Sequence, residues 1–137
     1  MPSQNRIFTL VGGIVALAGA AAAAAYAERT HERHDLESKA IAMTGGDIHR
    51  GEDAFSRYGC GGCHAVKGVP QANGNVGPPL DGIAGRAIIG GRLDNTPSNM
   101  TKWIVDPQAA SPGTAMPRLG VTAADSRDIT AFLYTRT

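Results

Sequence analysis

Two cysteines and a histidine are the residues of this 137-residue chain whose types and spacing could do the most distinctive chemistry. Cys60, Cys63 and His64 form a Cys-x-x-Cys-His motif, and the chain contains no other cysteine. This spacing is compatible with three kinds of site. They are a zinc knuckle, a thioredoxin-like redox pair, and covalent attachment of haem, in which both sulfurs bind the porphyrin vinyl groups and the histidine binds iron.

The sequence around the motif favours haem attachment. A zinc knuckle needs a second pair of ligands at comparable spacing, whereas the remaining histidines lie upstream of the motif. A thioredoxin-like pair follows a strand and opens a helix, but this pair closes a predicted helix and begins a Gly-rich loop. Fifteen of the 18 glycines and seven of the eight prolines lie from Gly45 onward, so the domain has a thin core of its own. A large apolar macrocycle would complete that core.

An iron bound by His64 needs a sixth ligand or keeps an open position, and two methionines follow the motif. Met100 lies on the apolar face of a helix predicted to begin near Thr96, so a core position is favoured for it. Met116 lies in the loop 111–117, which is fixed by Pro and Gly and lacks a periodicity that would explain an apolar side chain. A thioether is a soft donor suited to iron, and a Met/His pair raises the haem potential. These observations favour Met116 as the ligand.

The N-terminal segment bears on where in the cell the domain is located. Arg6 precedes an apolar run at residues 7–27, which is long enough to cross a bilayer as a helix. An uncleaved anchor is favoured because helix-forming sequence continues to Gly45, but residues 25–27 also offer a signal-peptide cleavage site. Either interpretation exports the rest of the chain, with the N-terminus in the cytoplasm. The expected organisation is an anchor or signal peptide at 1–27, a helical stalk at 28–44 and a domain at 45–137.

Four further stretches carry recognisable motifs. They are the helical stretch 51–55, the loop 77–86 with the pattern Gly-Pro-x-Leu-x-Gly-x-x-Gly-Arg, the segment 103–117 and the helical stretch 122–134. Together with the Cys-x-x-Cys-His motif, they resemble class I c-type cytochromes, the small monohaem electron carriers. The resemblance covers residues 45–137. The stretches 93–97 and 103–117 look most like bacterial cytochromes of membrane respiratory complexes, including the haem c domain fused to some oxidase second subunits.

The resemblance implies an all-α cytochrome c fold, with three to five helices around one covalently attached haem and an additional N-terminal transmembrane helix. Gly51 and Phe55 would meet the C-terminal helix, because a glycine lets two backbones approach closely. Cys60 and Cys63 would hold haem c through two thioethers, and His64 would be one iron ligand. The other implied site residues are Met116 as the second ligand, Pro78 accepting a hydrogen bond from the ligand histidine, Arg86 near a propionate, Thr114 at the haem edge and Trp103 beside the methionine.

An iron with both axial positions filled exchanges electrons, so electron transfer and not enzyme catalysis is expected. The expected protein is a membrane-tethered carrier, a monomer or a complex subunit, on the bacterial inner membrane with its haem domain in the periplasm. It would pass electrons from a quinol-oxidising complex or dehydrogenase to a terminal oxidase. Three alternatives remain: a soluble periplasmic protein after signal cleavage, a fixed subunit of a dehydrogenase or oxidase complex, and a haem enzyme or gas sensor with a labile Met116 bond.

The charge pattern restricts the partners. A net charge of +1 from 13 basic and 12 acidic residues argues against nucleic acid as a partner. Lys67 and Lys102 are the lysines of residues 45–137, so the lysine-rich docking face of mitochondrial family members is absent. Docking through a strong basic ring is therefore not expected.

Overall fold

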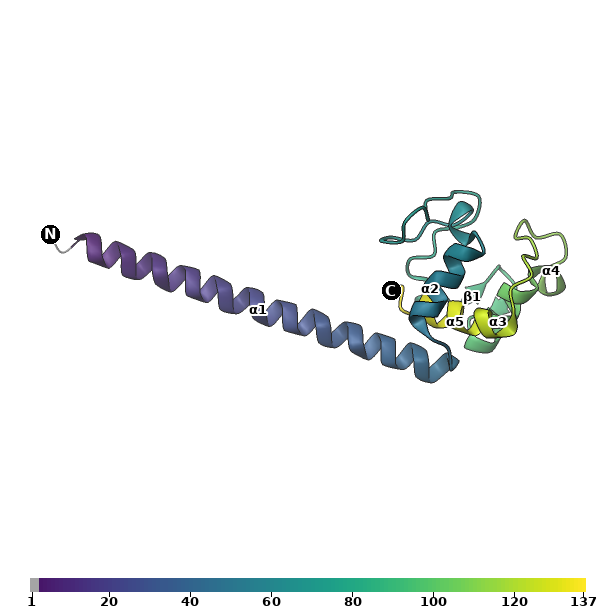
Figure 1. Ribbon diagram of the computed structural model, residues 1–137, viewed down its shortest axis with the longest axis horizontal. Coiled ribbons are helices and arrows are strands. Elements are labelled where there is room, and N and C mark those ends of the chain that lie inside the picture. The colour runs from purple at the N-terminus through teal and green to yellow at the C-terminus, as the bar shows by residue number, and fades with distance from the viewer. Residues whose placement is uncertain (1–2) are drawn as a thin grey trace. The chain divides into compact units, whose positions relative to one another are not determined.

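The computed structural model describes residues 3–137 and divides into two compact units, one ending at Asp35 and one running from Leu36 to Thr137. The elements in chain order are α1 (Ser3–Thr44), α2 (Ile48–Arg57), the 3-10 turns η1 (Cys60–Gly62) and η2 (Ile83–Gly85), β1 (Ile88–Ile89), β2 (Leu93–Asp94), α3 (Pro97–Val105), α4 (Pro107–Ala110) and α5 (Ala123–Tyr134) (Figure 1). The protein is mainly helical, as predicted.

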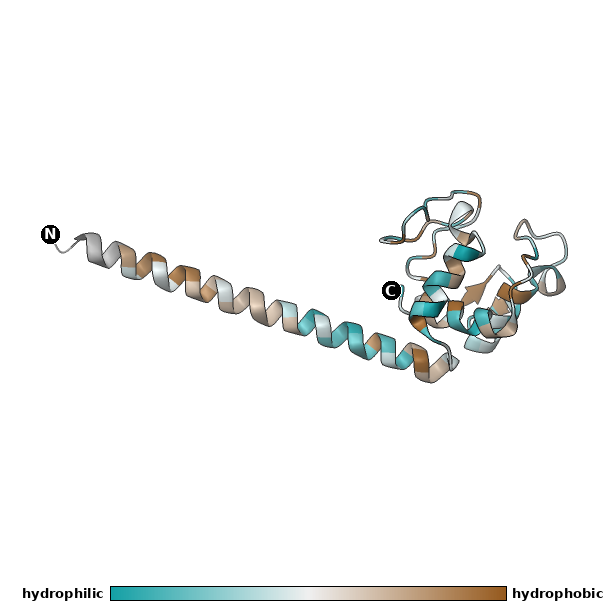
Figure 2. Cartoon of the chain, in the orientation of Figure 1, coloured by the Kyte–Doolittle hydropathy of each residue, from teal (hydrophilic) through white to brown (hydrophobic). Residues whose placement is uncertain are grey.

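The helix α1 is continuous through the predicted anchor and the predicted stalk. Apolar residues dominate its first half, and polar residues predominate from Glu28 until apolar residues return in the last turns (Figure 2). The stretch from Phe8 is long and apolar enough to cross a membrane by length and composition. The helix ends before Gly45, which adopts a positive φ of 66° typical of a helix C-terminus. The division of this helix into an anchor and a stalk at residue 27 stays a prediction.

The core of the second unit is built on the contact between α2 and α5. Gly51 faces α5 so closely that a Cβ atom there would lie 2.0 Å from the Asp128 carbonyl oxygen. One turn later, Phe55 packs on Phe132 with ring centroids 5.6 Å apart, and both rings are buried. The predicted meeting of these helices at a glycine and an aromatic residue is therefore confirmed.

Charged groups at the ends of the same two helices hold them together. The Arg50 guanidinium donates to Asp128 with an Nε–Oδ2 distance of 2.8 Å, and the backbone N–H of Asp47 donates to Asp128 Oδ1 at 2.7 Å. Near the other end of α2, the Tyr58 hydroxyl donates to Asp125 Oδ2 at 2.7 Å. These contacts link both ends of α2 to one face of α5.

A short antiparallel pair, β1 with β2, was not predicted. Ile88 lies opposite Asp94 and Ile89 lies opposite Leu93. The intervening Gly90 and Gly91 have positive φ values of 56° and 71°, which are the backbone angles that a tight hairpin turn requires. Two consecutive glycines directly after a pair of isoleucines are the sequence signal that could have identified it. The hairpin leads directly into α3, whose Trp103 and Ile104 are buried.

Candidate functional site

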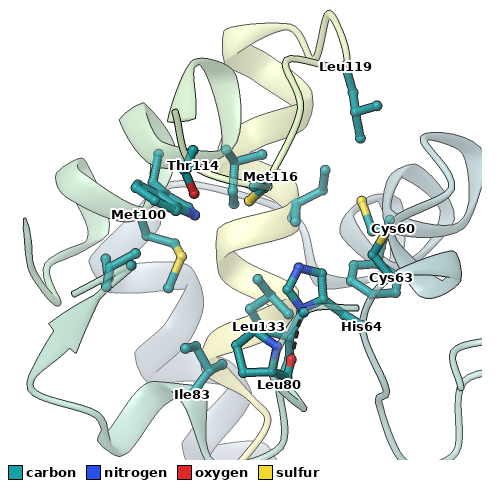
Figure 3. Close-up of a pocket in the computed structure, with 18 of the residues that line it drawn as sticks. Cys60, Cys63, His64, Leu80, Ile83, Met100, Thr114, Met116, Leu119 and Leu133 are labelled. Carbon is teal, nitrogen blue, oxygen red and sulfur yellow. Dashed lines mark hydrogen bonds between the residues drawn. The ribbon is translucent and has the colours of Figure 1, made fainter. Parts of the chain in front are cut away.

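The second unit contains a cavity of about 330 Å³ with mainly apolar walls (Figure 3). The residues labelled in Figure 3 that line it are Cys60, Cys63, His64, Leu80, Ile83, Met100, Thr114, Met116, Leu119 and Leu133. They come from the turn η1 and the loop that follows it, the turn η2, helix α3, the loop after α4 and helix α5. The cavity therefore brings together side chains from both ends of the sequence-predicted domain.

The two cysteines lie at one wall of this cavity, immediately after α2. Gly59, with a positive φ of 71°, ends the helix, and the turn η1 begins at Cys60. Both thiols are free, so the pair is not a disulfide. Burial raises the pKa of Cys60 to about 11, whereas redox-active and metal-binding thiols need a lowered pKa. The Cys60 thiol is thus poorly suited to disulfide exchange.

The His64 ring is oriented by the backbone of a second segment. Its Nδ1 lies 2.8 Å from the Pro78 carbonyl oxygen. A carbonyl only accepts hydrogen bonds, so Nδ1 donates and Nε2 keeps its lone pair, which is the arrangement of a metal-binding histidine. Backbone hydrogen bonds from Gly77 N to Cys63 O at 2.9 Å and from Leu80 N to Ala65 O at 2.9 Å hold the two segments side by side.

Gly77 leaves space for this ring. A Cβ at that position would lie 2.3 Å from His64 Cε1 and 2.7 Å from Nδ1. Ordinary contacts between carbon atoms are about 3.5–4.0 Å, so only glycine fits between the loop and the imidazole. The glycine that precedes the predicted hydrogen-bond acceptor, Pro78, thus has its own role in seating the histidine.

Both candidate methionines line the cavity. Met100 is 3% exposed and packs in the core on α3, which confirms the predicted buried position. It also faces the cavity, a position that the helical periodicity did not reveal (Figure 3). Met116 is half-buried in the irregular loop after α4. The structure therefore brings His64 and Met116 to one cavity, and the choice of Met116 as the ligand stays a prediction.

The remaining predicted site residues also line the cavity. Trp103 is 8% exposed, and its ring fills the space in front of Gly90, where a Cβ would lie 2.3 Å from Cη2. Thr114 belongs to the same loop as Met116. The Arg86 guanidinium donates to the carbonyl oxygens of Pro79 and Asp81. This arginine thus braces the loop beside His64, and its approach to a haem propionate stays a prediction.

Asn95 was missed by sequence reasoning. Its Nδ2 donates to the carbonyl oxygens of Ile83 at 2.7 Å and Arg86 at 2.8 Å, and its Oδ1 accepts from the Tyr134 hydroxyl at 2.8 Å. It thereby joins the loop that follows His64 to the end of α5. The sequence carries no local signal for this role, because all three partners are distant along the chain or lie in irregular backbone.

The donor set fits haem better than a bare metal ion. Residues 3–137 hold no cluster of three or more His, Cys, Asp or Glu side chains that could bind an ion. The cavity instead combines apolar walls, two free sulfurs at one wall, a histidine Nε2 and a methionine thioether. These are the groups that attach, ligate and enclose a haem.

The model of the Cytochrome c family matches residues 48–137. The chain belongs to the cytochrome c family. Among curated proteins, it is 31% identical to cytochrome c2 of Agrobacterium tumefaciens over 98 residues, which are 61% of this chain and 85% of that protein. It is 33% identical to cytochrome c-type cyt cy of Rhodobacter capsulatus over 103 residues, 66% of this chain and 49% of that protein.

A third relative is a subunit of a larger enzyme. Cytochrome c oxidase subunit 2 of Alkalihalophilus pseudofirmus is 38% identical over 69 residues, 50% of this chain and 19% of that protein. The chain thus spans from about a fifth to a half of these last two relatives. No solved structure matches the chain.

Family membership establishes the nature of the domain. It is a class I monohaem c-type cytochrome that carries one covalently bound haem c, and it is an electron-transfer domain rather than an enzyme. The predicted fold, cofactor and absence of catalysis are thereby confirmed. The matched region contains the Cys-x-x-Cys-His motif and the segment with Met116.

Proposed function

We propose that this cytochrome is a membrane-tethered periplasmic electron carrier whose haem iron is bound by His64 and Met116. It passes single electrons from a quinol-oxidising complex or a dehydrogenase to a terminal oxidase. The observation that supports this best is the placement of His64 Nε2 and the Met116 side chain at one apolar cavity, with both cysteines at its wall. Bound there, haem c supplies an iron that alternates between the ferric and ferrous states.

The chain's own groups favour electron exchange over ligand binding. The Pro78 carbonyl fixes the tautomer of His64, and this hydrogen bond makes the imidazole a stronger donor. Met116, as the second residue that would hold the iron, would stabilise the ferrous state and raise the potential. With both positions filled by the protein, oxygen or peroxide has no open site at the iron.

The tether is supported by α1. The apolar first half of this helix fits a bilayer core, and Arg6 at its start favours a cytoplasmic N-terminus. A tethered domain stays near its partners, and its effective concentration there is high without strong docking contacts. This agrees with the near balance of 13 basic and 12 acidic residues.

A respiratory partner is supported by the name of one relative. The haem domain resembles part of a cytochrome c oxidase subunit 2, a protein named as a component of a terminal oxidase. The same likeness favours a second candidate function, in which this chain is a fixed subunit of a dehydrogenase or oxidase complex. A stoichiometric complex recovered from native membranes in mild detergent would favour the fixed subunit, and a free monohaem protein would favour the carrier.

The ligand assignment is tested by the absorption spectrum of the ferric protein. We expect the weak near-infrared sulfur-to-iron band of a His/Met haem, its loss in Met116→Ala together with a lower potential, and its retention in Met100→Leu. Met100 is the matched control because its sulfur also lies at the cavity. Loss of the band in Met100→Leu instead, or a high-spin spectrum of the unaltered protein, would contradict the assignment and favour a haem enzyme or sensor.

The tether is tested by cell fractionation. The haem-stained protein should be in the membrane fraction and should need detergent for release. Recovery from the soluble periplasm with Glu28 as the N-terminal residue would show that residues 1–27 are a cleaved signal.

A further inference from the structure

The loop that carries Met116 is anchored by one side chain. Gln108 Nε2 donates to the Thr114 carbonyl oxygen at 2.8 Å and to the Met116 carbonyl oxygen at 2.9 Å. Gln108 Oε1 accepts from the Gly113 backbone N–H at 3.1 Å. Both donors and the acceptor of the amide are therefore used on a four-residue stretch that ends at the proposed ligand.

Gln108 is itself held by a rigid support. It lies in α4, whose first residue, Pro107, is among the most deeply buried side chains of the protein. Asp106 caps this short helix by accepting from the Ala109 backbone N–H at 3.0 Å. The helix closes with a hydrogen bond from Ser111 N to Pro107 O at 2.8 Å. The amide thus projects toward the loop from backbone that is fixed in the core.

The loop has few other attachments. Within the part of the chain that the structure describes, residues 112–121 have one backbone-to-backbone hydrogen bond outside regular elements, from Thr114 N to Ser111 O at 3.1 Å. An ion pair of 3.5 Å joins Arg118 to Asp106, but Arg118 is 66% exposed, and such pairs contribute little. Met116 also packs against the edge of the apolar core, but among the polar contacts of this loop the hydrogen bonds of the Gln108 amide are the main ones that hold the Met116 backbone.

We propose that Gln108 is a positioning residue that keeps the Met116 thioether at the haem iron and so limits the entry of outside ligands. This inference rests on the proposed ligation by Met116. By holding the carbonyls of Thr114 and Met116, the amide restricts the backbone angles that set the direction of the methionine side chain. Without it, the loop visits more conformations, and the sulfur leaves the iron more often.

The test measures how fast the methionine releases the iron. Imidazole is added in excess to the ferric full-length haem protein, and the rate at which it replaces the sixth ligand is followed by absorption at saturating imidazole. Three lost hydrogen bonds of ordinary net strength correspond to a rate on the order of tenfold to a thousandfold higher in Gln108→Leu.

A matched control separates positioning from general stability. Asn95 makes an equivalent set of bonds, with its amide donating to two loop carbonyls on the histidine side of the cavity. Asn95→Leu should lower the melting temperature to a similar extent while its imidazole rate stays within about twofold of the parent. Gln108→Glu keeps the acceptor for Gly113 but loses both donors, and it provides a second variant of nearly unchanged size.

The outcomes distinguish this inference from the ligand assignment. A parent protein without the sulfur-to-iron band overturns ligation by Met116 and this inference with it. The positioning role alone is overturned if the parent shows the band and both Gln108 variants exchange imidazole no faster than the parent. The same holds if they exchange it no faster than Asn95→Leu.

Discussion

Substituting Gly77 with alanine tests how the backbone seats the proposed histidine ligand. The new Cβ would lie 2.3 Å from His64 Cε1, 2.7 Å from Nδ1 and 2.9 Å from Nε2. Since ordinary carbon contacts begin near 3.4 Å, the ring or the loop must move by about 1 Å. The backbone hydrogen bond from Gly77 N to Cys63 O resists movement of the loop.

The cost follows from two contributions. Overpacking of a fitted contact costs about 1–3 kcal/mol. A shift of about 1 Å also breaks the 2.8 Å hydrogen bond between His64 Nδ1 and the Pro78 carbonyl, whose net value is about 0.5–1.5 kcal/mol. We therefore expect the free energy of unfolding of Gly77→Ala to fall by about 2–4 kcal/mol. The reduction potential should shift as well, because the orientation of His64 sets its donor strength.

Denaturant unfolding of the haem protein and a redox titration measure the two effects. Gly85→Ala is the matched control, because Gly85 belongs to the same segment, has no positive φ and has open space where the new methyl group would lie, with no other atom within 4 Å. The control should unfold within about 0.5 kcal/mol of the parent. If Gly77→Ala matches the control in both stability and potential, the loop does not seat the ring and the reasoning is refuted.

Three further predictions concern the scaffold. Gly51→Ala should lower the free energy of unfolding, measured in urea, by at least about 1–3 kcal/mol, because its Cβ would lie 2.0 Å from the Asp128 carbonyl oxygen. Gly62→Ala is the control because a Cβ at residue 62 has open space, and an equal effect of the two substitutions would contradict the prediction. Gly90→Ala should cost more than Gly91→Ala, since both have positive φ but only Gly90 faces the Trp103 ring at 2.3 Å; equal melting temperatures would argue against the contact. Burial raises the pKa of Asp128, but hydrogen bonds from Arg50 and from the Asp47 backbone N–H outweigh burial and hold the pKa below its usual value. The ionised Asp128 carboxylate therefore stabilises the fold above about pH 4, and this contribution is lost as the pH falls through the lowered pKa. Asp128→Asn should therefore lose less unfolding free energy on acidification than the parent, and parallel pH profiles would contradict the role of this carboxylate.

Local signals in the sequence predicted those parts of the fold that depend on neighbours along the chain. Thr96 caps α3, as predicted, by accepting from Asn99 N at 3.2 Å, and Pro97 occupies the first turn. The Cys-x-x-Cys-His motif and the glycine at residue 51 were also informative, because each needs a particular residue type at a particular place. Capping, spacing and close backbone approach leave a direct trace in residue identity.

Contacts between distant segments left no comparable trace. Asn95 and Gln108 act through side-chain amides on carbonyls of irregular backbone, and any residue can supply a carbonyl. The periodicity of α3 predicted that Met100 is buried, but not that it faces the cavity, because that depends on how α3 lies against α5. The predicted iron ligand, Met116, followed from the loop sequence, whereas the role of Gln108 in holding that loop could be recognised only in the three-dimensional structure.

The abundance of glycine has a physical reason beyond flexible loops. Gly61 and Gly74 lie where a side chain would collide with the backbone of the neighbouring segment, at 2.8 Å from Ala72 Cα and 2.4 Å from Gly62 O. Gly77 lies against the imidazole in the same segment pair. These contacts press the histidine segment and the loop after it together, and so they restrict motion instead of permitting it. A histidine ligand that is held by closely packed backbone should move little when the charge of a bound iron changes, and this rigidity favours rapid electron exchange. The glycines that leave the domain with few apolar side chains are therefore the same residues that fix the position of the histidine.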